Sequence, residues 1–200
     1  MQSAKLHLSF QQIKLVTNAE WILTKNEILR HIKTALEEMY TTQQSLIAQT
    51  SLPSEIVRSG GKISRGENYL GLPWMVLDYP RCFVKENIFA IRSLFWWGRL
   101  FSTTLHLSGK WQQQFAAPLL KASSRLRAGN FLISSNGNEW LHDAASEHYT
   151  EINNLQEPEF EKILQQAAFV KIAAFTGIEH INDAPEILMR QFELLVKIVS

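Results

Sequence analysis

Cysteine is almost absent from this 200-residue sequence, and long apolar runs are missing altogether. The single cysteine, Cys82, excludes an internal disulfide and any zinc cluster built from several cysteines. No stretch approaches the roughly 18 consecutive apolar residues of a membrane span. The first eight residues are too polar for the core of a signal peptide. We therefore expect a cytoplasmic protein with no membrane association.

An excess of charge of either sign is also lacking. The sequence holds 20 Lys+Arg against 19 Asp+Glu, a net charge of +1. Nucleic-acid binding is not expected, because such domains usually carry a basic excess. An apolar fraction of 46% excludes a disordered chain. The length suits one compact domain spanning residues 1–200, and no linker or internal repeat interrupts it.

Motifs that bind cofactors or metals are missing as well. The sequence has no phosphate-binding loop, no dinucleotide fingerprint, no zinc-protease motif and no nucleophile elbow. His142 and His148 lie six residues apart, with Asp143 and Glu147 between them, but this is no established metal-ligand spacing. We expect neither a cofactor nor a metal.

Helical patterns stand at both ends of the chain. Capping boxes begin at Ser9 and Thr24, and an apolar stripe from Ile28 to Met39 predicts a helix that runs to about Ala48. Further helices are predicted over 110–127, 157–176 and 184–200.

Strand patterns lie between the helices. Residues 88–96 and 99–108 form the clearest predicted hairpin, which we expect in the middle of the sheet because both arms are long and aromatic. The other predicted strands are 74–79, 130–134 and 139–142. This order indicates an α+β fold, with an antiparallel sheet of about five strands and the N-terminal and C-terminal helices packed on it.

One strand of the hairpin has a polar face. One face of this strand carries Ser102, Thr104, His106 and Ser108. The residues between them, which share the other face, are mainly apolar: Phe101, Thr103, Leu105 and Leu107. Such a face either meets water, as in many antiparallel sheets, or lines a polar cavity.

Charge is unevenly spread along the chain. Residues 61–129 carry 10 basic and 3 acidic groups, a net charge of +7, and residues 130–200 carry a net charge of −7. Two interpretations remain open. The basic segment either attracts an anion, or it pairs across an internal seam with acids such as Glu157, Glu161 and Glu193.

The favoured function is the binding of a small anionic ligand at a polar site on the sheet. Arginines would hold the anion, whereas Asp78 and His106 are candidates for acid–base chemistry. Asp78 ends an apolar strand, so it needs a partner, and that partner could be Arg65, Arg81 or Arg92 in a purely structural ion pair. Whether any reaction is catalysed stays open. The candidate ligand-binding residues are Arg65, Glu67, Tyr69, Asp78, Arg81, Arg92 and His106.

The alternative is a protein–protein interaction module. Trp96 and Trp97 are adjacent at the predicted hairpin tip and would point to opposite faces, so one of them is hard to bury. Tryptophan is common at interface hot spots, and the expected partner is another protein or a second copy of the chain.

Several central strings carry a resemblance. They are Arg65–Tyr69, Leu72–Trp74, Val76–Arg81, Phe95–Gly98 and Leu105–Gly109. In these strings the chain resembles a family of bacterial proteins of unknown function. The resemblance implies a bacterial cytoplasmic protein, and it implies no activity, cofactor or site residue.

Overall fold

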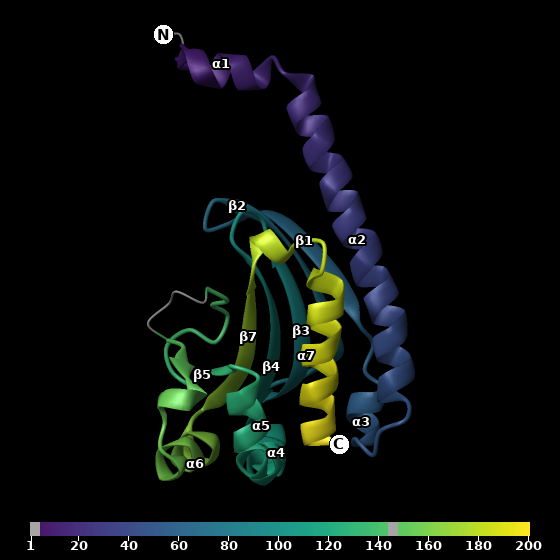
Figure 1. The fold of residues 1–200 in the computed structure, drawn as a ribbon, viewed down its shortest axis with the longest axis vertical. Helices are drawn as coiled ribbons and strands as arrows, with labels where there is room; N and C mark the ends of the chain where they lie inside the picture. Colours follow the sequence, from purple (N-terminus) through teal and green to yellow (C-terminus); the bar gives the residue numbers. More distant parts are fainter. Residues whose placement is uncertain (1–4, 144–147) are drawn as a thin grey trace.

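The computed structural model describes residues 5–143 and 148–200 and is built on one antiparallel sheet of seven strands (Figure 1). The order across the sheet is β1-β2-β3-β4-β7-β5-β6. The strands are β1 Lys62–Tyr69, β2 Leu72–Val84, β3 Asn87–Trp96, β4 Leu100–Ser108, β5 Leu132–Ser134, β6 Thr150–Glu151 and β7 Phe169–Gly177. The predicted α+β class is confirmed, with seven strands in place of about five.

The helices precede and follow the first four strands. They are α1 Phe10–Val16, α2 Ala19–Ile47, α3 Ser54–Val57, α4 Gly109–Lys121, α5 Ser123–Ala128, α6 Glu157–Gln166 and α7 Ala184–Val199, with short 3-10 turns at Ile152–Asn154 and Ile178–His180. The capping box at Ser9 is confirmed, with reciprocal contacts to Gln12. The long helix begins at Ala19, five residues before Thr24, and ends where its apolar stripe predicts. No helix in the described ranges is long and apolar enough to cross a membrane.

The predicted hairpin lies in the middle of the sheet. β3 and β4 pair over eight positions, from Phe89 opposite Leu107 to Trp96 opposite Leu100. β2 flanks one side and β7 the other. This prediction is confirmed. The hairpin takes the central position because its two long arms carry large side chains that can be buried on both faces of the sheet.

The largest error in the predicted secondary structure falls at residues 167–176. The helix predicted over 157–176 ends at Gln166, and the chain returns as β7. β7 pairs with β4 over nine positions, and most of its side chains are buried. A strand buried on both faces has no alternating pattern, so its apolar run looks like the continuation of a helix.

Two smaller segments also differ from the predictions. Polar residues 62–69 form the edge strand β1, which has little buried surface to reveal it. Residues 139–142 are not a strand, and β5 pairs instead with β6 and β7.

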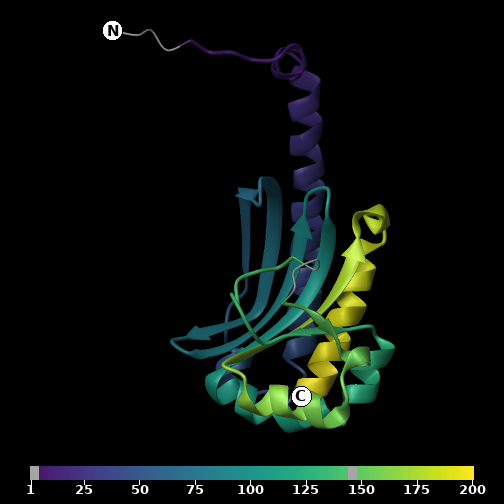
Figure 2. The ribbon, with the colours of Figure 1, turned by 90° about the vertical axis from the view of Figure 1, so that its left-hand side faces the viewer.

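The two faces of the sheet differ in what covers them. Helices α2, α4 and α7 cover one face and build the apolar core, which includes Phe95, Leu105 and Ile172. Residues 135–149 follow β5, and Figure 2 shows the described part of this segment in green, passing across the opposite face. The polar side of β4 belongs to that second face, and the candidate site lies there.

Candidate functional site

A row of ionisable side chains crosses the second face of the sheet. Lys171 on β7 lies opposite His106 on β4, and Arg92 on β3 lies opposite Asp78 on β2. His106 and Arg92 belong to neighbouring strands, because Arg92 pairs with Thr104, two residues before His106. Lys171, His106 and Asp78 are all at most 5% exposed. Charged groups this deeply buried are costly unless they are paired, so the row requires nearby partners.

A short covering segment, residues 139–142, supplies several of these partners. Glu139 Oε2 lies 3.1 Å from His106 Nε2, and the carbonyl of Leu141 accepts a hydrogen bond from Lys171. The indole of Trp140 packs edge-on against the His106 ring, with centroids 5.6 Å apart. The segment therefore shields the row from water.

Arg92 and Asp78 form a bidentate pair. Arg92 Nε donates to Asp78 Oδ1 at 2.7 Å, and Nη2 donates to Oδ2 at 2.9 Å. Arg92 Nη1 also contacts Nε2 of His142. These contacts use three of the five N–H groups of the guanidinium. Of the three arginines considered as partners for Asp78, Arg92 is the one that the fold selects.

The Arg92 contact fixes the tautomer of His142. Arginine only donates, so Nε2 of His142 must accept, and the proton of the neutral ring sits on Nδ1. Burial, together with the nearby Arg92 charge, lowers the pKa of His142 well below its usual value, so the ring is neutral at physiological pH. Nδ1 is buried and has no partner among the described residues. His142 therefore holds a buried N–H donor that no described residue accepts.

Tyr149 presents a second unpaired donor nearby. Its hydroxyl is buried without a partner in the described part of the chain, and its ring lies 5.2 Å from the Lys171 ammonium. Burial raises the pKa of the Tyr149 phenol, which keeps the proton in place. Buried donors are normally paired in proteins, so these two donors need acceptors beyond the described residues.

A cavity of about 270 Å³ opens beside Arg92. Its polar end contains Arg92, Asp78, His142 and Tyr69, whose hydroxyl accepts a hydrogen bond from the His142 amide at 2.8 Å. The remaining wall is mostly apolar. The other lining residues are Ser64, Trp74, Val76, Leu94 and Trp140.

Local sequence explains two parts of this wall. Trp74 lies against Gly66 on β1, where a Cβ would come within 2.5 Å of the indole nitrogen, so only glycine leaves room for the ring. Tyr69 is held by Trp96, whose indole N–H donates to the Tyr69 carbonyl at 3.1 Å.

The structure brings together only part of the predicted site. Tyr69, Asp78 and Arg92 line the cavity, and His106 lies beside it in the same row. Arg65, Glu67 and Arg81 are exposed elsewhere. Glu67 pairs with Lys25 of α2, and the Arg81 guanidinium lies 4.9 Å from the Phe83 ring centroid.

The expected Asp78–His106 pair does not form. Asp78 binds Arg92, and His106 faces Glu139, because the diagonal row places Arg92 between them. Burial, with smaller contributions from Lys171 and Arg92, lowers the pKa of His106 to about 3. A ring this weakly basic is neutral at physiological pH and donates to the Glu139 carboxylate.

The sequence pattern does not reveal several residues of the site. Lys171 falls inside the predicted helix 157–176, and Glu139, Trp140 and His142 fall in the predicted strand 139–142. A usable signal existed at Lys171, a lone cation within the apolar run Phe169–Phe175.

The tryptophans of the hairpin tip differ in burial. Trp96 is 2% exposed, whereas Trp97 is partly buried and packs against Phe95, with centroids 6.1 Å apart, so the tip offers little exposed aromatic surface. The seam interpretation fails at the acids named for it. Glu193 pairs with Lys197 of its own helix, and no ion pair within the described ranges joins Glu157 or Glu161 to the basic segment.

The described residues contain no cluster of three or more His, Cys, Asp or Glu side chains that could hold a metal ion. Of the residues considered as metal ligands, His148 is among the described residues, whereas Glu147 lies outside them.

In the comparisons with known proteins, no family model matches the chain, and no curated protein matches it.

The buried histidines predict a loss of stability in acid. In the unfolded chain His106 binds a proton near pH 6.5, whereas in the folded protein it stays neutral down to about pH 3. The free energy of unfolding therefore falls as the pH drops below 6.5. Between pH 6.5 and 5 the His106 contribution is about 2 kcal/mol, at 1.36 kcal/mol per pH unit. Urea denaturation of His106→Gln should show a shallower fall than the parent. The exposed His31→Gln on α2 is the matched control, and an equal fall in all three proteins would contradict the assignment.

Proposed function

We propose that this protein binds a small ligand with an anionic group and a flat apolar body in the cavity beside Arg92. The observation that carries the proposal is the Arg92 guanidinium, which lines the cavity beside a His142 ring whose buried Nδ1 donor has no acceptor among the described residues. An anionic oxygen is the acceptor that satisfies such donors most strongly.

Repulsion between two buried cations favours an anion over a neutral group. Asp78 offsets the charge of Arg92, and Glu139 beside His106 partly offsets that of Lys171 in the same row. Burial, and then the Arg92 charge, lowers the pKa of Lys171 to about 7, so a second cation is only partly tolerated there. A ligand anion would offset the repulsion between Arg92 and Lys171.

The apolar wall indicates the rest of the ligand. Trp74, Leu94 and Trp140 offer rings and methyl groups to a flat or aliphatic body. The volume of about 270 Å³ lies just below the common range for ligand pockets, roughly 300–1,000 Å³. An aromatic or branched carboxylate of metabolite size fits these features better than a nucleotide does.

Benzoate is a suitable probe, and isothermal titration calorimetry measures its binding. Arg92→Lys keeps the charge but removes the planar fork, and we expect benzoate to bind at least about tenfold more weakly. The matched control is Arg65→Lys, which changes an exposed arginine outside the cavity and should bind like the parent.

A second variant covers the case in which Arg92→Lys does not fold. Trp140 is 48% exposed, so Trp140→Ala should fold, and it should lose affinity because it removes part of the apolar wall. Trp21→Ala, at a similarly exposed tryptophan on α2, is its control. The proposal is overturned if benzoate does not bind the parent, or if the cavity variants bind as tightly as their controls.

The proposal concerns binding and assigns no reaction. The bacterial family and the cytoplasmic location stay predictions that rest on the sequence.

A further inference from the structure

The N-terminal arm, residues 5–23, projects beyond the sheet with its apolar side chains uncovered. Figures 1 and 2 show α1 and the first turns of α2 standing clear of the rest of the molecule. Nine of the twelve exposed large apolar residues in the described ranges belong to this arm, among them Phe10 at 81% and Trp21 at 53% exposure. The others are Leu6, Leu8, Ile13, Leu15, Val16, Ile22 and Leu23.

These residues form amphipathic faces. In α1, Phe10, Ile13 and Val16 recur every three residues, so they share one side of the helix. In α2, Trp21 lies seven residues before Ile28, so it extends the stripe that packs on the sheet. The stripe therefore continues past the edge of the body it covers.

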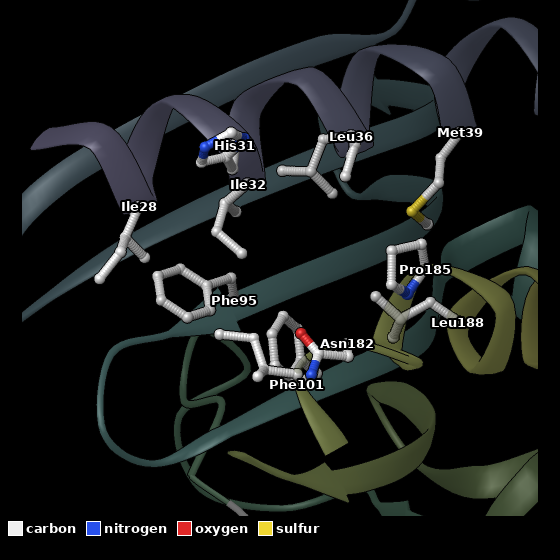
Figure 3. Close-up of a pocket in the computed structure, with 12 residues that line it drawn as sticks. Ile28, His31, Ile32, Leu36, Met39, Phe95, Phe101, Asn182, Pro185 and Leu188 are labelled. Carbon is white, nitrogen blue, oxygen red and sulfur yellow. The ribbon is translucent and has the colours of Figure 1, made fainter. Parts of the chain in front are cut away.

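An apolar groove begins where the arm leaves the body. This α2–α7 groove has a volume of about 340 Å³ and lies between the two helices, above the sheet. Figure 3 shows its α2 side chains pointing toward two sheet phenylalanines, with α7 on the other side. Its principal apolar residues are Ile28, Ile32, Leu36, Phe95, Phe101 and Leu188.

The arm and the groove also differ in charge. The arm contains Lys5 and Lys14 against the single acid Glu20. Beside the groove, Asp183 and Glu186 are exposed and flank the lining residues Asn182 and Pro185 in sequence. Glu186 also pairs with Arg190 of its own helix, so the attraction between the arm and this rim rests mainly on the two lysines and Asp183.

We propose that two copies of this chain form a two-fold dimer in which the arm of each copy lies in the α2–α7 groove of the other. α2 is one helix of 29 residues, about 43 Å long, and it has no interior proline or glycine. It therefore carries Trp21, Ile22 and Leu23 away from the body, where the groove of the same chain cannot cover them. A reciprocal exchange closes on itself, as two-fold interfaces do.

The exposed area is sufficient for a stable dimer. At roughly 200 Å² for a fully exposed large side chain, the nine residues offer on the order of 1,000 Å² per copy. A standard interface buries about 800 Å² per partner, so the dimer would have to cover most of this area.

Sedimentation equilibrium of the full chain tests the proposal. The parent should have twice the 23.0 kDa mass of one chain. An arm variant, Phe10→Asp with Trp21→Asp, should weaken the dimer at least about tenfold, since each buried large side chain contributes roughly 1.5–3 kcal/mol. Val84→Asp, at a 58% exposed apolar residue on β2, is the matched control and should stay dimeric.

Mixing two variants distinguishes arm-in-groove binding from contact between two arms. The groove variant Ile28→Asp should also be monomeric. When it is mixed with the arm variant, one intact arm meets one intact groove, so a mixed dimer should appear, weaker than the parent. If circular dichroism shows that Ile28→Asp is unfolded, the rim variant Asp183→Lys with Glu186→Lys replaces it.

Three results would overturn the proposal: a parent that is monomeric at every soluble concentration, a dimer that survives the arm variant, or mixed variants that fail to associate. In the first case, a parent that sediments with vesicles of phosphatidylcholine and phosphatidylglycerol, and an arm variant that does not, would assign the arm to a membrane surface.

Discussion

Asp78→Asn is expected to lower the free energy of unfolding by about 3 kcal/mol, the usual cost of breaking a buried ion pair from one side. The substitution leaves the Arg92 guanidinium with a neutral amide in place of a carboxylate that accepts two hydrogen bonds. The side chains of Asp78 and Arg92 are 8% and 16% exposed, so water cannot replace the lost contacts well. Urea denaturation at neutral pH measures the change.

Glu67→Gln is the matched control, because it removes the acid of an ion pair in which Glu67 is 64% exposed. An exposed pair contributes at most about 1 kcal/mol, so this variant should be nearly as stable as the parent. If Asp78→Asn were equally stable, the Asp78 carboxylate would have to be solvated, and the cavity would not be a shielded site.

Raising the pH from 7 to 9.5 should stabilise the protein through Lys171, by about 3 kcal/mol at 1.36 kcal/mol per pH unit. The folded lysine loses its proton near pH 7, whereas in the unfolded chain it keeps the proton to its ordinary value of 10.5. The unfolded state therefore binds more protons throughout this range, and stability increases with pH. The tyrosines with raised pKa values titrate above this range.

Lys171→Met should remove most of this slope, because the variant has no proton to lose at that position. Lys121→Met, at an exposed lysine in the last turn of α4, should keep the full slope. Denaturation midpoints at several pH values compare the three proteins. Parallel curves of stability against pH for the parent and Lys171→Met would contradict the lowered pKa of Lys171. They would also remove the argument from repulsion between Lys171 and Arg92.

The centre of the fold could be predicted from sequence, whereas its edges and the strand β7 could not. The hairpin over 88–108 has long alternating arms, and the α2 stripe is regular, so local pattern and final structure agree. At β7 the pattern is lost, because helices α4 and α7 cover one face of the strand and residues 139–142 cover the other. The strand β1 gives no apolar pattern either, because it is an edge strand with polar side chains. Its pairing with β2 determines its structure more than its own residues do.

The candidate site divides in the same way. Asp78 and Arg92 could be singled out because a charge within an apolar strand needs a partner, and the β2–β3 register then places them opposite each other. His142 and Glu139 reach the site through a segment without regular structure, which no periodicity describes. Their contribution depends on how that segment crosses the sheet (Figure 2).

The most direct test of ligand binding at Arg92 is to titrate the protein with benzoate and with its neutral analogue benzamide, and to record the indole N–H resonances of all six tryptophans. Trp74 and Trp140 line the cavity, so benzoate should shift their signals saturably, with little change at Trp21 on the arm. Benzamide has nearly the same shape without the charge, and it should bind at least about tenfold more weakly. Equal binding of the two compounds, or shifts confined to tryptophans outside the cavity, would contradict an anion site at Arg92.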